Sequence, residues 1–95
     1  MEITAQQIID DIKSALKQFG EYTYYDKGAD EVMDVYKYTR PLKDMGAEKA
    51  ITLLEEVEKY EHSSSFIIDI IMFLDDWDNE EGDKFFQSDL VGRHY

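Results

Sequence analysis

Apolar residues recur every three or four positions near the start of the chain, and this spacing predicts a helix from Thr4 to Phe19. The apolar face consists of Ala5, Ile8, Ile9, Ile12, Ala15, Leu16 and Phe19. Thr4 and Gln7 have the spacing of a capping box, in which each side chain bonds the backbone N–H of the other residue. Gly20 follows the helix and is the residue type that most often ends one. Both boundaries of this helix are therefore predicted.

Residues 21–38 fit two structures. The segment Tyr22-Thr23-Tyr24-Tyr25 has strand propensity, and with the turn-like Asp26-Lys27-Gly28 it suits a β-hairpin. Asp30 to Tyr38 also has the spacing of a helix. We favour an aromatic connector followed by a short helix, because an isolated two-stranded ribbon needs another element to cover it. Arg40-Pro41 then predicts a break, because proline pushes the preceding residue out of the helical region.

Three further apolar patterns predict helices in the second half of the chain. From Ala47 to Tyr60 one face is apolar and the opposite face is rich in glutamate. The run from Phe66 to Leu74 is apolar on nearly all sides, so we expect a central helix, capped by one of the serines at 63–65. Lys84 to Val91 predicts a short closing helix before a tail at 92–95. The fold class is therefore all-α, a compact bundle of four to five helices.

Length and composition indicate one small domain. A chain of 95 residues with 43% hydrophobic residues can build a single core and should fold alone. It has no cysteine, which excludes disulfides and fits a reducing compartment. The acidic start Met1-Glu2 is unlike a secretory signal, and the run at 66–74 is far shorter than the ~20 residues of a membrane span. We expect a cytoplasmic protein.

The net charge is strongly negative. Twenty-two acidic against ten basic residues give a formal charge of −12, which repels nucleic-acid phosphates and anionic lipids. Direct binding to nucleic acid or membrane is therefore disfavoured, and a basic protein is the expected partner. The simpler alternative is that the acidity only maintains solubility.

The densest charged feature runs from Asp75 to Asp83, and we call it the acidic segment. It surrounds a single tryptophan with six acids, and its candidate partner-binding residues are Asp75, Asp76, Trp77, Asp78, Glu80, Glu81 and Asp83. An aromatic anchor inside a charged rim would dock a basic partner. The alternative is a solvated helix end, with Trp77 folded back onto a core formed by Phe73 and Phe85.

A second candidate surface combines tyrosines with an acid. It consists of Tyr22, Tyr24, Tyr25 and Asp26. Rigid aromatic rings with polar tips are favoured in protein recognition. Packing of these rings in the core is the competing use.

The residue pattern predicts neither an enzyme nor a metal or cofactor site. A calcium loop starting at Asp76 fails on spacing, because Gly82 comes one residue late and position twelve is Gln87. His62 and His94 have no neighbouring nucleophile or metal ligand at a recognisable spacing. The serines at 63–65 lack the flanking glycines of a nucleophile elbow. Asp69, inside the apolar run, fits a solvent-facing stripe.

The profile of a short, acidic, cysteine-free, helical chain resembles the immunity proteins that bacteria make against their own nuclease toxins, of the colicin and contact-dependent-inhibition types. Tyr24-Tyr25 followed by Asp26 is similar to the paired tyrosines of the helical colicin DNase immunity family, although here the pair comes earlier in the chain and no proline follows it. The resemblance implies an inhibitor that presents carboxylates where a basic nuclease expects phosphates. An acidic helical adaptor, or a phage-type inhibitor that mimics nucleic acid, would share this profile.

Overall fold

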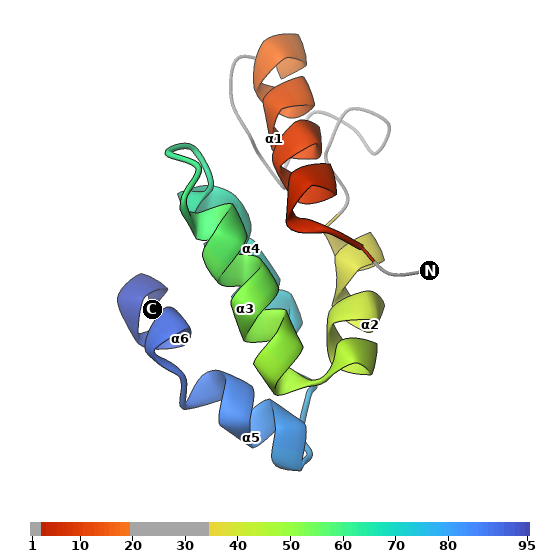
Figure 1. Ribbon diagram of the computed structural model, residues 1–95, viewed down its shortest axis with the longest axis vertical. Helices are drawn as coiled ribbons and strands as arrows, with labels where there is room; N and C mark the ends of the chain where they lie inside the picture. The colour runs from red at the N-terminus through yellow and green to blue at the C-terminus, as the bar shows by residue number, and fades with distance from the viewer. Residues whose placement is uncertain (1–2, 20–34) are drawn as a thin grey trace.

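The computed structural model describes residues 3–19 and 35–95, and these residues form helices only (Figure 1). The helices are α1 (Ala5–Phe19), α2 (Tyr36–Met45), α3 (Ala47–Glu58), α4 (Ser64–Phe73), α5 (Glu80–Phe86) and α6 (Asp89–His94). The all-α prediction is confirmed. The hairpin alternative for residues 21–38 has no support, because residues 36–38 are helical and residues 21–34 lie outside the described part of the chain.

Helix α3 occupies the centre of the bundle and packs against every other described helix. Figure 1 shows α2, α3 and α4 running antiparallel in succession, with α5 crossing the end where α3 begins. We expected the run at 66–74 to be central, and as α4 it contributes much of the core. Helix α4, however, contacts mainly α2, α3 and α6.

The core is made of apolar side chains from all six described helices. Its largest fully buried members are Phe66, Phe85, Ile8, Ile12, Leu42, Leu54, Ile67, Ile70, Ile71, Leu74, Leu90 and Val35. Burial removes their apolar surface from water, which is the main favourable term in folding. None of the described helices is both long enough and apolar enough to cross a membrane.

The predicted capping box of α1 is present with both of its hydrogen bonds. The N–H of Gln7 donates to Thr4 Oγ1 at 3.2 Å, and the N–H of Thr4 donates to Gln7 Oε1 at 2.9 Å. Helix α1 also contacts α2 through a hydrogen bond, in which the hydroxyl of Tyr38 donates to the carboxylate of Asp11. Burial of Tyr38 and its bond to this carboxylate raise the pKa of the tyrosine.

The predicted break at Arg40-Pro41 is wrong, because Pro41 lies inside α2. Proline removes one hydrogen bond of the helix, a cost that packing can outweigh. Here Tyr38 and Leu42, on either side of the proline, are both buried in the core. Burial of these two side chains accounts for the helix continuing through Pro41.

The predicted closing helix at 84–91 is wrong in its bounds, because the structure has two helices there. Ser88 separates them: its hydroxyl donates to the carbonyl of Phe85 at 2.6 Å and accepts from the N–H of Val91 at 3.5 Å. Residues 92–94, expected in a tail, belong to α6.

Ser63 does stand at the start of α4, as expected for a cap, but its side chain makes no capping bond.

Candidate functional site

The acidic segment runs from the turn after α4 into the first turn of α5, and backbone and side-chain bonds fix its path. The N–H of Trp77 donates to the carbonyl of Leu74 at 2.9 Å, which closes the turn after α4. Asn79 then caps α5, because its Oδ1 accepts from the N–H of Gly82 at 3.0 Å. Such capping satisfies an N–H group that the helix itself leaves unpaired. The carboxylates of the segment are therefore held on a defined backbone.

Trp77 is buried rather than displayed. Its side chain is only 5% exposed, and its ring centroid lies 5.5 Å from that of Phe85. Gly82 lies directly against it, since a Cβ at position 82 would be 1.8 Å from the carbonyl oxygen of Trp77. The alternative in which Trp77 folds onto the core is thus the observed one. The expectation of an aromatic anchor on this surface is corrected, because too little of Trp77 faces solvent.

Two of the predicted site carboxylates are bonded to neighbouring elements of the fold. Asp76 accepts from Lys43 Nζ at 2.5 Å, and this bond lowers the pKa of Asp76. Glu81 Oε1 accepts from the N–H of Ala47 at 2.9 Å, and its other oxygen lies 3.3 Å from Lys84 Nζ. The bond from Ala47 is the main reason why the pKa of Glu81 is lowered. Both carboxylates attach the acidic segment to the junction between α2 and α3.

Glu81 takes the place of a local cap for α3. Gly46 precedes this helix with φ of +90° and has no side chain to accept a bond from the first N–H groups. The carboxylate of Glu81, which lies 34 residues after Ala47 in the sequence, supplies that acceptor. Negative charge at a helix N-terminus is also favoured by the helix dipole.

We expect Glu81→Ala to lower the midpoint of urea denaturation, because the N–H of Ala47 loses its acceptor. Glu80→Ala is the matched control, since Glu80 is exposed and has no such bond. The pKa of Glu81 is lower in the folded state than its ordinary value of 4.5. Its ionised form therefore stabilises the fold above that value, and this stabilisation is lost as the pH falls through the lowered pKa.

Denaturation of the natural protein and of both variants, at neutral pH and at a series of acidic values, checks this prediction. The difference between the natural protein and Glu81→Ala should shrink as the pH falls. Equal midpoints for Glu81→Ala and Glu80→Ala at neutral pH would contradict the capping role.

The remaining four carboxylates of the acidic segment face solvent. They belong to Asp75, Asp78, Glu80 and Asp83, and no cation of the described residues pairs with any of them. Glu80 and Asp83 stand three positions apart on α5, which places them on one face of that helix. Like charges held close together repel, so an approaching cationic group would relieve that repulsion. These four carboxylates form the candidate binding site.

A half-exposed apolar groove lies next to the point where Glu81 caps α3, and we call it the N-terminal groove. It has a volume of about 380 Å³ and lies between the first described residues, the end of α2 and the first three turns of α3. Its apolar lining consists of Ile3, Ala5, Met45 and Leu53. Sequence reasoning missed this groove, because the lining comes from three separate segments.

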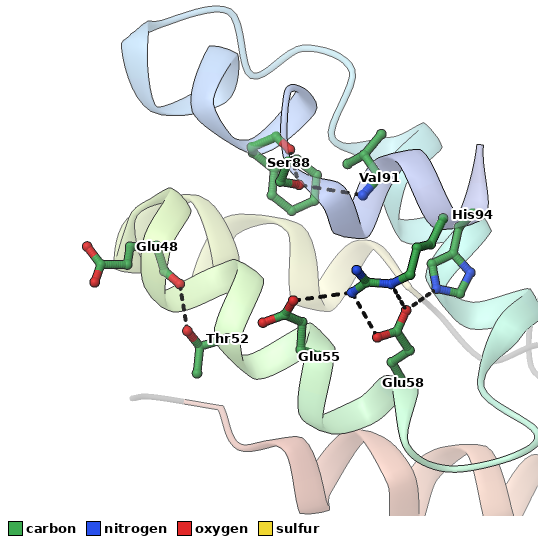
Figure 2. A network of polar contacts seen from close by, with 9 residues as sticks. Glu48, Thr52, Glu55, Glu58, Ser88, Val91 and His94 are labelled. Atoms are coloured by element: carbon green, nitrogen blue, oxygen red, sulfur yellow. Dashed lines mark hydrogen bonds and ion pairs between the residues drawn. The ribbon is translucent and has the colours of Figure 1, made fainter.

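A cluster of ion pairs attaches α6 to the C-terminal end of α3 (Figure 2). The sequence did not predict this cluster either. Arg93 lies 2.9 Å from Glu58 and 3.2 Å from Glu55, and His94 Nε2 lies 2.7 Å from Glu58. The bonds from Arg93, and next those from His94, lower the pKa of Glu58. His94, expected in a free tail, thus has a structural partner. The only sequence signal was opposite charge, which does not identify a partner so far along the chain.

The other residues that the sequence singled out are dispersed. Tyr22, Tyr24, Tyr25 and Asp26 lie outside the described residues. His62 lies exposed between α3 and α4, beside Tyr60. Partial burial raises the pKa of Asp69 on α4, and no described residue bonds its carboxylate. Within the described part of the chain, no three His, Asp or Glu side chains are placed to hold a metal ion.

Comparison with known proteins returns no relative. No protein-family model matches the chain, and no curated protein or solved structure does so either.

Proposed function

We propose that this chain is an immunity protein or similar inhibitor, which binds and neutralises a basic toxin of the nuclease class through the acidic segment. One observation carries the proposal: Asp75, Asp78, Glu80 and Asp83 are exposed and lack cationic partners among the described residues. A nuclease needs a positive surface to hold its substrate. Carboxylates presented to that surface would occupy the place of the phosphates.

The charge of the whole chain supports rapid capture of such a partner. A net charge of −12 creates a negative field that steers basic proteins toward the surface and raises the association rate. The acidic segment is also held in place by the Asn79 cap, by buried Trp77 and by the Asp76–Lys43 pair. A site that is already ordered loses less conformational entropy on binding.

An acidic adaptor is the second candidate function, and the N-terminal groove favours it. An adaptor needs an apolar groove in a surface of mixed charge, whereas a nucleic-acid mimic needs a continuous acidic face. The groove has an apolar lining, and Lys49 lies at its edge beside Glu48 and Glu56. The two functions differ in their result, because an inhibitor abolishes the activity of its partner and an adaptor leaves that activity intact.

The test compares two variants with equal net charge. The acidic-segment variant carries Asp75→Asn, Asp78→Asn, Glu80→Gln and Asp83→Asn. The control variant neutralises four exposed acids elsewhere, with the changes Asp10→Asn, Asp44→Asn, Glu61→Gln and Asp89→Asn. Each protein is used as bait in extract of its native cells, at low and at moderate salt. The retained partner is identified and its affinity for each bait is measured.

We expect one basic partner at a fixed stoichiometry, bound on the order of tenfold more weakly by the acidic-segment variant, since exposed charges each contribute a fraction of a kcal/mol. The control variant should retain most of the affinity. Loss of nuclease activity in the complex would support the inhibitor, and unchanged partner activity would favour the adaptor. A neutral partner bound equally at both salt concentrations, or no stable partner, would refute the inhibitor and move the adaptor to the front.

A further inference from the structure

We propose that the N-terminal groove receives an apolar side chain from a basic, amphipathic segment of the same partner. This inference rests on the proposed function, since it takes the partner to be a basic protein. A buried Trp77 leaves the acidic segment without an apolar anchor. Charge alone gives steering, whereas affinity at protein interfaces usually depends on a few buried apolar contacts. The groove supplies a place for such a contact.

The lining of the groove suits an aliphatic or aromatic side chain. Ile3, Ala5, Met45 and Leu53 each pack partly against the core and leave the rest of their apolar surface exposed. The volume of about 380 Å³ lies near the lower end of the roughly 300–1,000 Å³ range of ligand pockets. It fits one or two side chains better than a larger ligand. Methionine in the lining also adapts its shape to different occupants.

The hydroxyl of Thr52, in the wall of the groove, already has a hydrogen-bond partner within the protein. The hydroxyl of Thr52 already donates to the carbonyl of Glu48 at 3.0 Å, as Figure 2 shows. An apolar side chain entering the groove would therefore leave this hydroxyl paired. For this hydroxyl the cost of burying an unpaired polar group is avoided.

The charges at the edge of the groove favour basic residues beside that apolar side chain. Glu48 is exposed and has no cationic partner among the described side chains, and Glu56 shares only an exposed pair with Lys59 at 3.2 Å. Exposed pairs of this kind are weak, so Glu56 remains open to a stronger partner. Lys49 is a single opposing cation at the same edge. Among the described residues the edge therefore has an excess of negative charge.

The acidic segment and the groove meet at the first turn of α3. Glu81 of the acidic segment caps Ala47, and the next residue of α3, Glu48, already lines the groove. The groove therefore begins one residue of α3 away from the contact with the acidic segment. This continuity points to one partner for both surfaces, rather than to a second copy of this acidic chain, which like charge would repel.

The experiment measures binding of labelled model peptides by fluorescence anisotropy. The first probe is an amphipathic helical peptide of lysine and leucine. A lysine and serine peptide has the same charge without the apolar face, and a glutamate and leucine peptide has the apolar face with opposite charge. The proteins are the natural chain, Leu53→Gln, the acidic-segment variant and Ile51→Gln. Ile51 is the matched control, because it is half-buried on α3 but does not line the groove.

We expect the lysine and leucine peptide to bind the natural protein at least about tenfold more tightly than either other peptide. Leu53→Gln should lower its affinity to that of the lysine and serine peptide, and Ile51→Gln should not. Because Leu53 contributes to packing, Thr52→Phe provides a second variant, which fills the groove from an exposed position without removing a core contact. It should weaken binding as Leu53→Gln does. Amide resonances of Ile3, Met45 and Leu53 should shift on titration of the natural protein.

The possible failures are distinguishable. If the acidic-segment variant loses affinity but neither groove variant does, the groove inference is wrong and the proposed function stands. If no variant changes affinity, both are refuted. Tighter binding of the glutamate and leucine peptide would overturn the charge argument. Shifts of the same amides with protein concentration alone would show that a second copy occupies the groove.

Discussion

Replacement of Gly82 by alanine should destabilise the protein by on the order of 3 kcal/mol, the upper part of the range for overpacked positions. The added Cβ would lie 1.8 Å from the carbonyl oxygen of Trp77 and 2.6 Å from its carbonyl carbon. Both are backbone atoms, so a change of side-chain rotamer cannot relieve the clash. Either the turn before α5 must move, or Trp77 must leave the ring of Phe85. Chemical denaturation followed by circular dichroism measures the loss.

Gly92→Ala is the matched control within α6. A Cβ at position 92 would meet no atom within 4 Å. Alanine is favoured over glycine inside a helix by about 0.5–1 kcal/mol, so this variant should be slightly more stable than the natural protein. Tryptophan fluorescence should change in Gly82→Ala and stay unchanged in Gly92→Ala. Equal stability of the two variants would mean that the turn at Trp77 does not have the described geometry.

Phe66→Ala should cost about 3–5 kcal/mol, the usual range for removing a fully buried aromatic side chain. Phe66 has no exposed surface, and its ring meets that of Tyr38 edge to face at 5.7 Å between centroids. The change removes the apolar contacts of the ring and leaves a cavity between α2 and α4. Native stability is roughly 0.05–0.15 kcal/mol per residue, so this loss would be a large part of the total for so small a chain.

Met72→Ala serves as the control on the same helix. Met72 is 42% exposed, so its truncation should change the free energy of unfolding by no more than about 0.5 kcal/mol. Urea denaturation of both variants gives the comparison. A small loss for Phe66→Ala, close to that for Met72→Ala, would contradict the burial of this face of α4.

The helices that the sequence predicted well are those with a long, regular apolar face. The spacing of Ile8, Ile12 and Ala15 reports directly which side of α1 is buried, and the Thr4–Gln7 pair marks its start. Local rules failed where tertiary packing opposed them. Pro41 indicated a break, but the flanking buried residues continue the helix across it. At the C-terminus, Ser88 ends one helix and caps the next, which apolar spacing alone does not reveal.

The sequence identifies a charged region, but not which of its residues are bonded within the fold and which are free. Six acids around Trp77 identified the charged surface, because charge is visible in the sequence. Which acids are free depends on contacts with distant residues: Asp76 with Lys43, and Glu81 with Ala47. The burial of Trp77 likewise depends on residue 82 being a glycine, which has no side chain, and on the ring of Phe85. No local pattern encodes these pairings.

Residues that hold the backbone are interspersed with free carboxylates along the acidic segment, and this arrangement has a consequence for how the protein can diverge. Asp76, Trp77, Glu81 and Gly82 hold the backbone, while the carboxylates of Asp75, Asp78, Glu80 and Asp83 point to solvent without partners among the described residues. Changes at exposed positions outside special contacts usually alter stability little. Descendants of this sequence can therefore exchange the free positions, and with them the choice of target, while inheriting the same scaffold.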